Sequence, residues 1–281
     1  MQCLASASAG MNCQRRLVED WFRGGSVPAQ GSVGVAGRLT GARALITGAS
    51  GGIGSSITSA FLAEGASVVA VGRSGVALES LAKRHGNLHT IVADVGVADA
   101  AADAVARSSQ LMGGVNVVVN AAAVDTGWAR TADISVSTWD ETIRVNLSGT
   151  YYVCRAAIPL LVAAGGGSII NVTSIGAKRA LESDAAYNAS KAGVELLTRT
   201  IAREYGPNGV RANCVAPGVI DAGITNREIT DPEERTSLAR LHSLQRLGRP
   251  EEVAEAIVWL ASSASTFTTG STLLVDGGFL A

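Results

Sequence analysis

The chain has 281 residues and a formal net charge of −1, and 47% of its residues are hydrophobic but only 4% aromatic. Because the charge is near zero and no basic cluster stands out, the sequence gives no support to nucleic-acid binding. No apolar run approaches the roughly 20 residues that a membrane-spanning helix needs. The length suits one domain with a substantial core, and the many small residues favour a parallel sheet covered by closely packed helices.

Residues 1–38 are rich in Ala, Ser and Gly and are predicted to form a disordered N-terminal tail. The tail has no continuous apolar core of the kind found in a secretory signal, and the acidic pair Glu19-Asp20 counts against a transit peptide. Alternatively, the aromatic pair Trp21-Phe22 could dock the tail on a neighbouring subunit. We expect residues 39–281 to form a single domain.

From Arg43 onward, short apolar runs alternate with helical segments, which is typical of βαβ units and a parallel sheet. The predicted strands are Ala44–Thr47, Ser67–Val71, Leu88–Ala93, Val115–Asn120, Ser168–Thr173, Val210–Val215 and Thr272–Val275. The longer predicted helices are Thr138–Ala164, Ala185–Tyr205 and Pro250–Ala261. The expected fold is α/β, with about seven strands in one doubly wound parallel sheet and helices on both faces.

A glycine-rich turn follows the first predicted strand and has the spacing TGxxxGxG. Glycines at this place let backbone N–H groups approach a pyrophosphate at the N-terminus of the next helix. A glycine-rich loop alone is weak evidence, but its position after the first strand makes the prediction of a dinucleotide site strong. The residues expected to contact the dinucleotide here are Gly48, Ser50, Gly52, Ile53 and Gly54.

Tyr187 and Lys191 are four residues apart in a predicted helix and therefore share one face. A phenol has a pKa of about 10, and a nearby ammonium could lower it by up to about three units, less the cost of desolvation. Such a Tyr would be suited to acid–base chemistry near neutral pH. A Tyr–Lys pair is also common on solvated helix faces. The functional interpretation of this pair therefore depends on two further residues, Ser174 at a strand end and Asn146.

Together these motifs resemble the short-chain dehydrogenase/reductase family, and the resemblance extends from Gly41 to the C-terminus. It implies a Rossmann-type fold in which Tyr187 is the proton donor or acceptor and Ser174 orients the substrate oxygen. Lys191 would support Tyr187 and hold the cofactor ribose. Asn146 would hold a water beside the lysine and complete a proton relay, although it could simply bond local backbone.

The resemblance implies further cofactor contacts at the ends of later strands. Asp94 would meet the adenine amino group, and the backbone of Ile220 would hold the nicotinamide carboxamide. The usual threonine of the family is replaced by Ala222, and Thr225 could take over its contact. The predicted cofactor residues outside the first turn are Arg73, Asp94, Val95, Asn120, Ala121, Tyr187, Lys191, Pro217, Gly218 and Ile220.

The end of the second strand bears on cofactor choice. In dinucleotide folds an acid at this place binds the ribose 2′-OH, whereas an Arg accommodates a 2′-phosphate. Here Gly72 takes the place of the acid and Arg73 follows it, so NADP(H) is the predicted cofactor and NAD(H) is possible. Gly51 stands where many NADP-preferring relatives carry a second basic residue, so the expected preference is moderate. Arg73 could also be an ordinary solvated arginine.

The cysteines and histidines show no metal-like spacing, and no metal site is predicted. Cys154 and Cys214 fall in a predicted helix and strand, where buried free thiols are expected, and this favours a reducing cytoplasm. We interpret His85, His89 and His242 as surface or loop residues.

The predicted function is hydride transfer between NADP(H) and a small secondary alcohol or ketone. An alternative enzyme is a 3-oxoacyl thioester reductase, whose acidic carrier protein could contact Lys178 and Arg179, although these could equally be plain surface charges. A non-catalytic nucleotide-binding regulator on the same fold is the alternative of another class. The complete Ser, Tyr, Lys and Asn set disfavours it.

The polar segment 221–248 follows the predicted nicotinamide turn and is expected to act as a substrate lid. The two long helical segments carry many small residues, and their counterparts pair across subunits in this family. A homotetramer is therefore expected, or else a homodimer, and no membrane or nucleic-acid partner is predicted.

Overall fold

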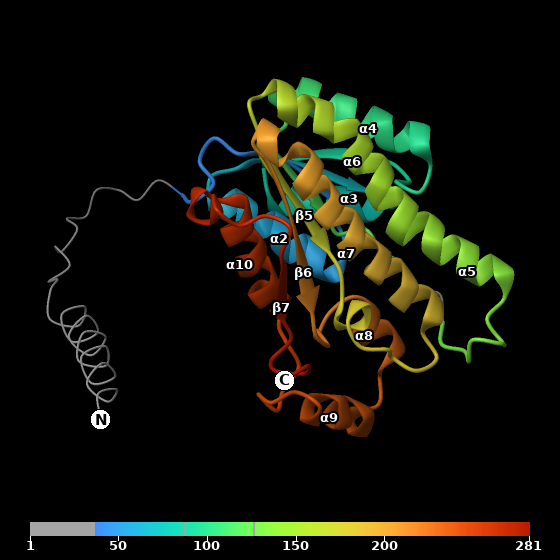
Figure 1. Cartoon of the computed structure of the whole chain (residues 1–281). Helices are drawn as coiled ribbons and strands as arrows, with labels where there is room; N and C mark the ends of the chain where they lie inside the picture. Colours follow the sequence, from blue (N-terminus) through green and yellow to red (C-terminus); the bar gives the residue numbers. More distant parts are fainter. Residues whose placement is uncertain (1–36, 87, 126) are drawn as a thin grey trace, which may run out of the picture. The chain divides into compact units, whose positions relative to one another are not determined.

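The computed structural model describes residues 37–281, apart from residues 87 and 126. One sheet of seven parallel strands forms the centre of this unit, as predicted, in the order β3-β2-β1-β4-β5-β6-β7. Helices lie on both sides of this sheet (Figure 1). Most of the predicted N-terminal tail lies outside the described residues. The strands are β1 (Arg43–Thr47), β2 (Ser67–Gly72), β3 (His89–Val92), β4 (Val117–Asn120), β5 (Gly167–Val172), β6 (Val210–Pro217) and β7 (Thr272–Val275).

Helices cover both faces of the sheet, because strand side chains alternate between two apolar cores. In β1, Ala44 and Ile46 face one core, and Leu45 faces the other. The first core is shared with α2, α3 and α10, and the second with α4, α6 and α7. The helices are α2 (Gly52–Ala63), α3 (Gly75–Arg84), α4 (Ala98–Met112), α5 (Val136–Ile143), α6 (Gly149–Ala163), α7 (Ala185–Tyr205), α8 (Ile224–Glu228), α9 (Pro232–Arg240) and α10 (Pro250–Ala261).

The start of the domain is fixed by Arg38, which the sequence placed in the tail. Its guanidinium forms ion pairs with Glu64 at 2.5 Å and with Glu255 at 2.9 Å. The next residue, Leu39, is only 2% exposed and packs in the first core. Arg38 therefore ties the beginning of the domain to α10 and to the end of α2.

The predicted continuous helix Thr138–Ala164 is wrong in one respect, because a π-helical turn at Arg144–Ser148 separates α5 from α6. The turn contains Asn146, whose side chain is fully buried. Single π-turns inserted in helices often occur at functional sites, since they redirect side chains that a regular helix would place elsewhere. The helices α7 and α10 begin and end where the sequence predicts.

The two core cysteines are buried and free, as predicted, and His242 lies in a loop, as predicted, although its side chain is buried and not at the surface. His242 follows α9 and is only 1% exposed, since its ring packs against Phe279. Within the described range no helix is long and apolar enough to cross a membrane. The same residues contain no cluster of His, Cys, Asp and Glu that could hold a metal.

Candidate active site

A cavity of about 740 Å³ opens at the carboxyl ends of the strands, where parallel α/β sheets bind their ligands. Two predicted site residues, Asn120 and Asn146, do not line it. The predicted residues that do line it are Gly48, Ser50, Gly52, Ile53, Gly54, Arg73, Asp94, Val95, Ala121, Ser174, Tyr187, Lys191, Pro217, Gly218 and Ile220.

The glycine-rich turn between β1 and α2 forms one wall of the cavity, and its glycines are required by close packing. Gly48 has a positive φ of 64°, and a Cβ there would lie 2.6 Å from the Ala121 carbonyl oxygen. A Cβ on Gly54 would collide with the Gly48 carbonyl oxygen. No side chain caps the N-terminus of α2, which begins at Gly52. This backbone therefore suits an anionic group such as a pyrophosphate.

Lys191 and Tyr187 meet on one face of α7, as their spacing predicts. The Lys191 ammonium lies 5.5 Å from the centre of the Tyr187 ring and donates a hydrogen bond to the Val172 carbonyl oxygen at 3.0 Å. Lys191 is only 3% exposed, and desolvation by burial lowers its pKa to about 8. A positive charge at the base of the cavity therefore titrates close to the physiological range.

Ser174 follows β5 and lines the same cavity as Tyr187. Its hydroxyl oxygen accepts a hydrogen bond from the Gly176 amide at 3.0 Å, which fixes the side chain. A hydroxyl that accepts one bond can still donate its hydrogen to a ligand oxygen. Ser174, Tyr187 and Lys191 thus bring together a donor, a titratable phenol and a cation.

Asn146 and Asn120 support the cavity from behind its wall. The Asn146 side chain bonds both backbone groups of Val124, accepting from the amide at 2.8 Å and donating to the carbonyl at 2.9 Å. It also donates to the Ser190 hydroxyl at 3.2 Å. Asn120 donates to Asn171 at 2.8 Å inside the sheet. Both residues therefore hold the chain after β4 in place, and the water relay through Asn146 stays a prediction.

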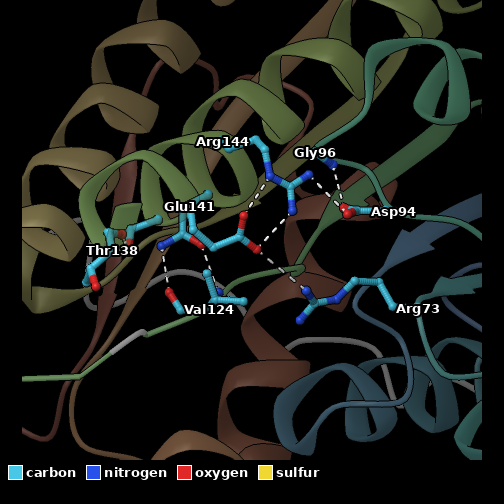
Figure 2. A network of polar contacts seen from close by, with 9 residues as sticks. Arg73, Asp94, Gly96, Val124, Thr138, Glu141 and Arg144 are labelled. Carbon is cyan, nitrogen blue, oxygen red and sulfur yellow. Dashed lines mark hydrogen bonds and ion pairs between the residues drawn. The ribbon is translucent and has the colours of Figure 1, made fainter. Parts of the chain in front are cut away.

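Four charged side chains form a chain of contacts where the adenosine part of a dinucleotide is expected (Figure 2). Arg144 binds Glu141 through two nitrogens, at 2.7 and 2.9 Å, and Asp94 through a third at 3.0 Å. An Arg73 nitrogen lies 3.9 Å from Glu141 Oε1, the oxygen that also accepts the 2.9 Å bond from Arg144. The hydrogen bonds from Arg144 lower the pKa of Glu141, so this carboxylate stays ionised. Asp94 also accepts from the Gly96 amide at 2.9 Å.

The sequence did not single out Glu141 or Arg144. Their i,i+3 spacing of opposite charges is a signal for a helix-surface pair, but it does not show that the pair reaches Arg73 and Asp94. That contact depends on how α5 packs beside the ends of β2 and β3.

Segment 221–248 lines the cavity from the substrate side through both of its helices, α8 and α9. Thr225 is among the lining residues, and Ala222 lies against the glycine-rich turn, where a Cβ on Gly52 would come within 2.8 Å of it. Arg235 on α9 binds Asp221 at 2.5 Å and Asn226 at 2.9 Å. These bonds connect the start of the segment to both helices.

His242 joins this segment to the predicted nicotinamide turn. Its Nε2 accepts a hydrogen bond from the Val219 amide at 3.2 Å, so the ring must carry its proton on Nδ1, which donates to the Leu238 carbonyl at 3.0 Å. The Val219 carbonyl accepts from the Gly248 amide at 2.9 Å. Both backbone polar groups of Val219 are therefore held by segment 221–248, and no local sequence signal identified His242.

The chain is similar to known proteins over most of its length. The family described as "Enoyl-(Acyl carrier protein) reductase" matches residues 48–280. D-threitol dehydrogenase of Mycolicibacterium smegmatis is 37% identical over 86% of this chain and 94% of its own length. The 3-oxoacyl-[acyl-carrier-protein] reductase of Thermotoga maritima is also 37% identical, over 86% of this chain and 99% of its own. The crystal structure of gox2181 has a TM-score of 0.83 at 28% identity, and the match covers 86% of this chain and 98% of that one.

The chain therefore belongs to the short-chain dehydrogenase/reductase family. It is an oxidoreductase of the alcohol and ketone class, and its family binds nicotinamide cofactors.

Proposed function

We propose that this protein interconverts a ketone and a secondary alcohol with NADP(H), using Ser174, Tyr187 and Lys191 as its catalytic residues and Asn146 as their support. The observation that carries the proposal is the position of Lys191 above the Tyr187 ring in the cavity that Ser174 also lines. A nicotinamide cofactor, when bound, supplies or accepts the hydride.

The protein residues handle the proton and the charge on the substrate oxygen. In the direction of reduction, Tyr187 gives its phenolic proton to the carbonyl oxygen as the carbon gains the hydride, and the product is a neutral alcohol. Ser174 donates a hydrogen bond to the same oxygen, and this bond strengthens as negative charge develops there. The Lys191 ammonium stabilises the phenolate that remains, until solvent returns the proton.

The residues present fit a dinucleotide along the cavity. The glycine-rich turn and the N-terminus of α2 would hold the pyrophosphate, Lys191 the ribose next to the nicotinamide, and the backbone near Ile220 the carboxamide. Asp94 and Val95 would lie at the adenine. Pro217 and Gly218 contribute to the cavity wall beside the nicotinamide position.

NADP(H) is the proposed cofactor because Arg73 lines the cavity at the end of β2 with 55% of its side chain exposed, and Gly72 adds no acid. A charge-assisted contact with a 2′-phosphate typically contributes about 1.5–3 kcal/mol, or roughly tenfold to a hundredfold in affinity. Arg73→Ala should therefore weaken NADPH binding and barely change NADH binding. Gly72→Asp should shift the preference toward NADH, because the new carboxylate would repel the phosphate. A wild-type kcat/KM that is higher with NADH would overturn this assignment.

The substrate is proposed to be a small ketone or alcohol rather than a carrier-bound thioester. Lys178, the expected carrier contact, is paired with the buried Glu195 at 3.0 Å, and Arg179 lies over the Phe279 ring. Asp125 and Glu182 line the cavity and would repel an acidic carrier protein. The relative from Thermotoga maritima keeps the thioester alternative open to test.

The decisive experiment measures nicotinamide absorbance with each cofactor against free ketones, their alcohols including threitol and gluconate, and 3-oxoacyl thioesters. Turnover of free ketones or alcohols supports the proposal, and turnover of thioesters alone supports the alternative. Cofactor binding without any turnover would support a regulator. A cytoplasmic location also belongs to this proposal, because Cys154 and Cys214, the cysteines in the described part of the chain, are free thiols.

A further inference from the structure

We infer that Glu141 is a cofactor-specificity residue whose fixed negative charge weakens the binding of a 2′-phosphate at Arg73. The inference rests on the proposed use of NADP(H). It identifies Glu141 as a residue that reduces the preference for this cofactor. Glu141 lies on α5, outside the residues that line the cavity, and it acts through its charge and its contact with Arg73.

The Glu141 carboxylate lies next to Arg73, the group proposed to bind the phosphate. One Glu141 oxygen is 3.9 Å from an Arg73 nitrogen. A phosphate that binds the same guanidinium therefore comes close to a carboxylate of like charge. Figure 2 shows the Arg73 guanidinium directed toward Glu141.

Glu141 is held in place by its neighbours and cannot readily move away when a phosphate binds. Both of its oxygens are engaged by Arg144, at 2.7 and 2.9 Å, in a two-pronged contact of the kind that fixes geometry. Arg144 is held in turn by Asp94 at 3.0 Å, and the Gly96 amide holds Asp94 at 2.9 Å. A Cβ on Gly96 would collide with Arg144, so the local backbone is adapted to this arrangement.

The charges of the four side chains in this cluster, Arg73, Arg144, Glu141 and Asp94, cancel one another. Arg73 and Arg144 contribute two positive charges, and Glu141 and Asp94 contribute two negative ones, so the four together are neutral. A 2′-phosphate carries roughly −1.5 to −2 charges near neutral pH and gains less from a neutral cluster than from a positive one. Replacing Glu141 by glutamine would leave the cluster with one net positive charge and would release part of Arg144 toward the ligand.

The size of the effect is limited because the side chains are 32–55% exposed and solvent screens them. We expect Glu141→Gln to raise the affinity for NADPH relative to NADH about three- to tenfold, and the upper value corresponds to about 1.4 kcal/mol. NADH lacks the 2′-phosphate and serves as the internal reference for any general change in the site.

The experiment measures dissociation constants of NADPH and NADH by the fluorescence of the reduced nicotinamide, at low and at physiological ionic strength. Asp140→Asn is the matched control, because it removes the same charge from the neighbouring exposed position of α5 and should leave the ratio unchanged. Glu141→Asp keeps the charge and should stay close to the wild-type ratio. The gain in Glu141→Gln should shrink in high salt and in a double variant that also carries Arg73→Ala.

Two results would overturn the inference. An unchanged ratio in a folded Glu141→Gln protein would show that the carboxylate does not affect the phosphate, and a weaker NADPH affinity would show that Glu141 instead positions Arg73 for it. The proposed cofactor preference is judged separately, by whether the wild-type protein binds NADPH more tightly than NADH. The effect of Glu141 is judged only by the change in that ratio, so either statement can fail alone.

Discussion

At the residue scale, α7 places the Tyr187 phenol and the Lys191 ammonium in one cavity, and removal of the phenol alone should separate chemistry from cofactor binding. Tyr187→Phe should lower kcat by about 10²- to 10⁴-fold, which is the usual contribution of a positioned acid or base. Its affinity for the reduced cofactor should remain near the wild-type value. Steady-state kinetics and cofactor fluorescence test this. If a folded Tyr187→Phe protein kept substantial turnover, another group would have to be the acid.

The buried charge of Lys191 also predicts a pH dependence of stability in the cofactor-free protein. The folded-state pKa of about 8 lies below the ordinary value of 10.5, because burial disfavours the charged form. The cost of burying the ammonium is therefore fully present below pH 8. It declines as the pH rises from about 8 to 10.5, because only the folded protein then releases its proton.

Lys191→Met should remove this dependence and abolish turnover. At pH 7 the variant should unfold at a temperature equal to or above that of the wild type, because an uncompensated buried charge is costly. The difference in thermal midpoint should shift in favour of the wild type as the pH is raised toward 10. A wild-type advantage at pH 7 that does not change with pH would show that the bond from Lys191 to the Val172 carbonyl outweighs the burial cost.

At the element scale, the hydrogen bond from the Val219 amide to His242 connects the turn after β6 to segment 221–248. His242→Leu keeps much of the volume but leaves the Val219 amide without its acceptor, and an unsatisfied buried amide costs about 1–3 kcal/mol. We expect the affinity for both reduced cofactors to fall by about tenfold in this variant.

His242→Gln is the matched comparison, because its amide oxygen can replace Nε2 as the acceptor. It should recover most of the cofactor affinity that His242→Leu loses. Equal losses in the two variants would show that the ring acts through its packing on Phe279 rather than through the hydrogen bond. Thermal unfolding of both proteins separates a general loss of stability from a local change at the turn.

At the scale of the whole molecule, two exposed apolar regions support the proposed assembly of several subunits. Trp139, Tyr151 and Leu196 are 39–61% exposed on the adjacent helices α5, α6 and α7. Phe267 and Leu274 are exposed near the edge strand β7, which has a neighbour on one side only. Two separate regions would suit a tetramer with two kinds of interface, whereas one would suit a dimer.

Light scattering at micromolar concentration should therefore give a homotetramer, or else a homodimer. Leu196→Glu should break the interface on the helices, and Phe267→Glu the one near β7, so each variant should reduce a tetramer to a dimer. Deletion of residues 1–36, which keeps the Arg38 ion pairs, should leave the assembly intact. A monomeric wild-type protein would contradict the proposal. Loss of assembly on deletion would show that the tail takes part.

The sequence by itself determined the order of strands and helices, because hydrophobic periodicity and glycine positions are local properties of the chain. The same local rules predicted glycines at positions 48, 52 and 54, where other atoms of the chain come too close for a side chain. They also put Tyr187 and Lys191 on one helix face. These relations span a few residues, so spacing alone specifies them.

Only the tertiary structure decided which distant side chains meet. It brought Glu141 beside Arg73 and bonded the buried His242 to Val219 in the turn after β6. It also directed the Asn120 side chain into the sheet instead of the cavity. The π-turn at Asn146 likewise depends on its bonds to Val124, which comes from another element. Such contacts depend on how whole elements pack against one another, and packing is a property of the folded chain that local spacing does not encode.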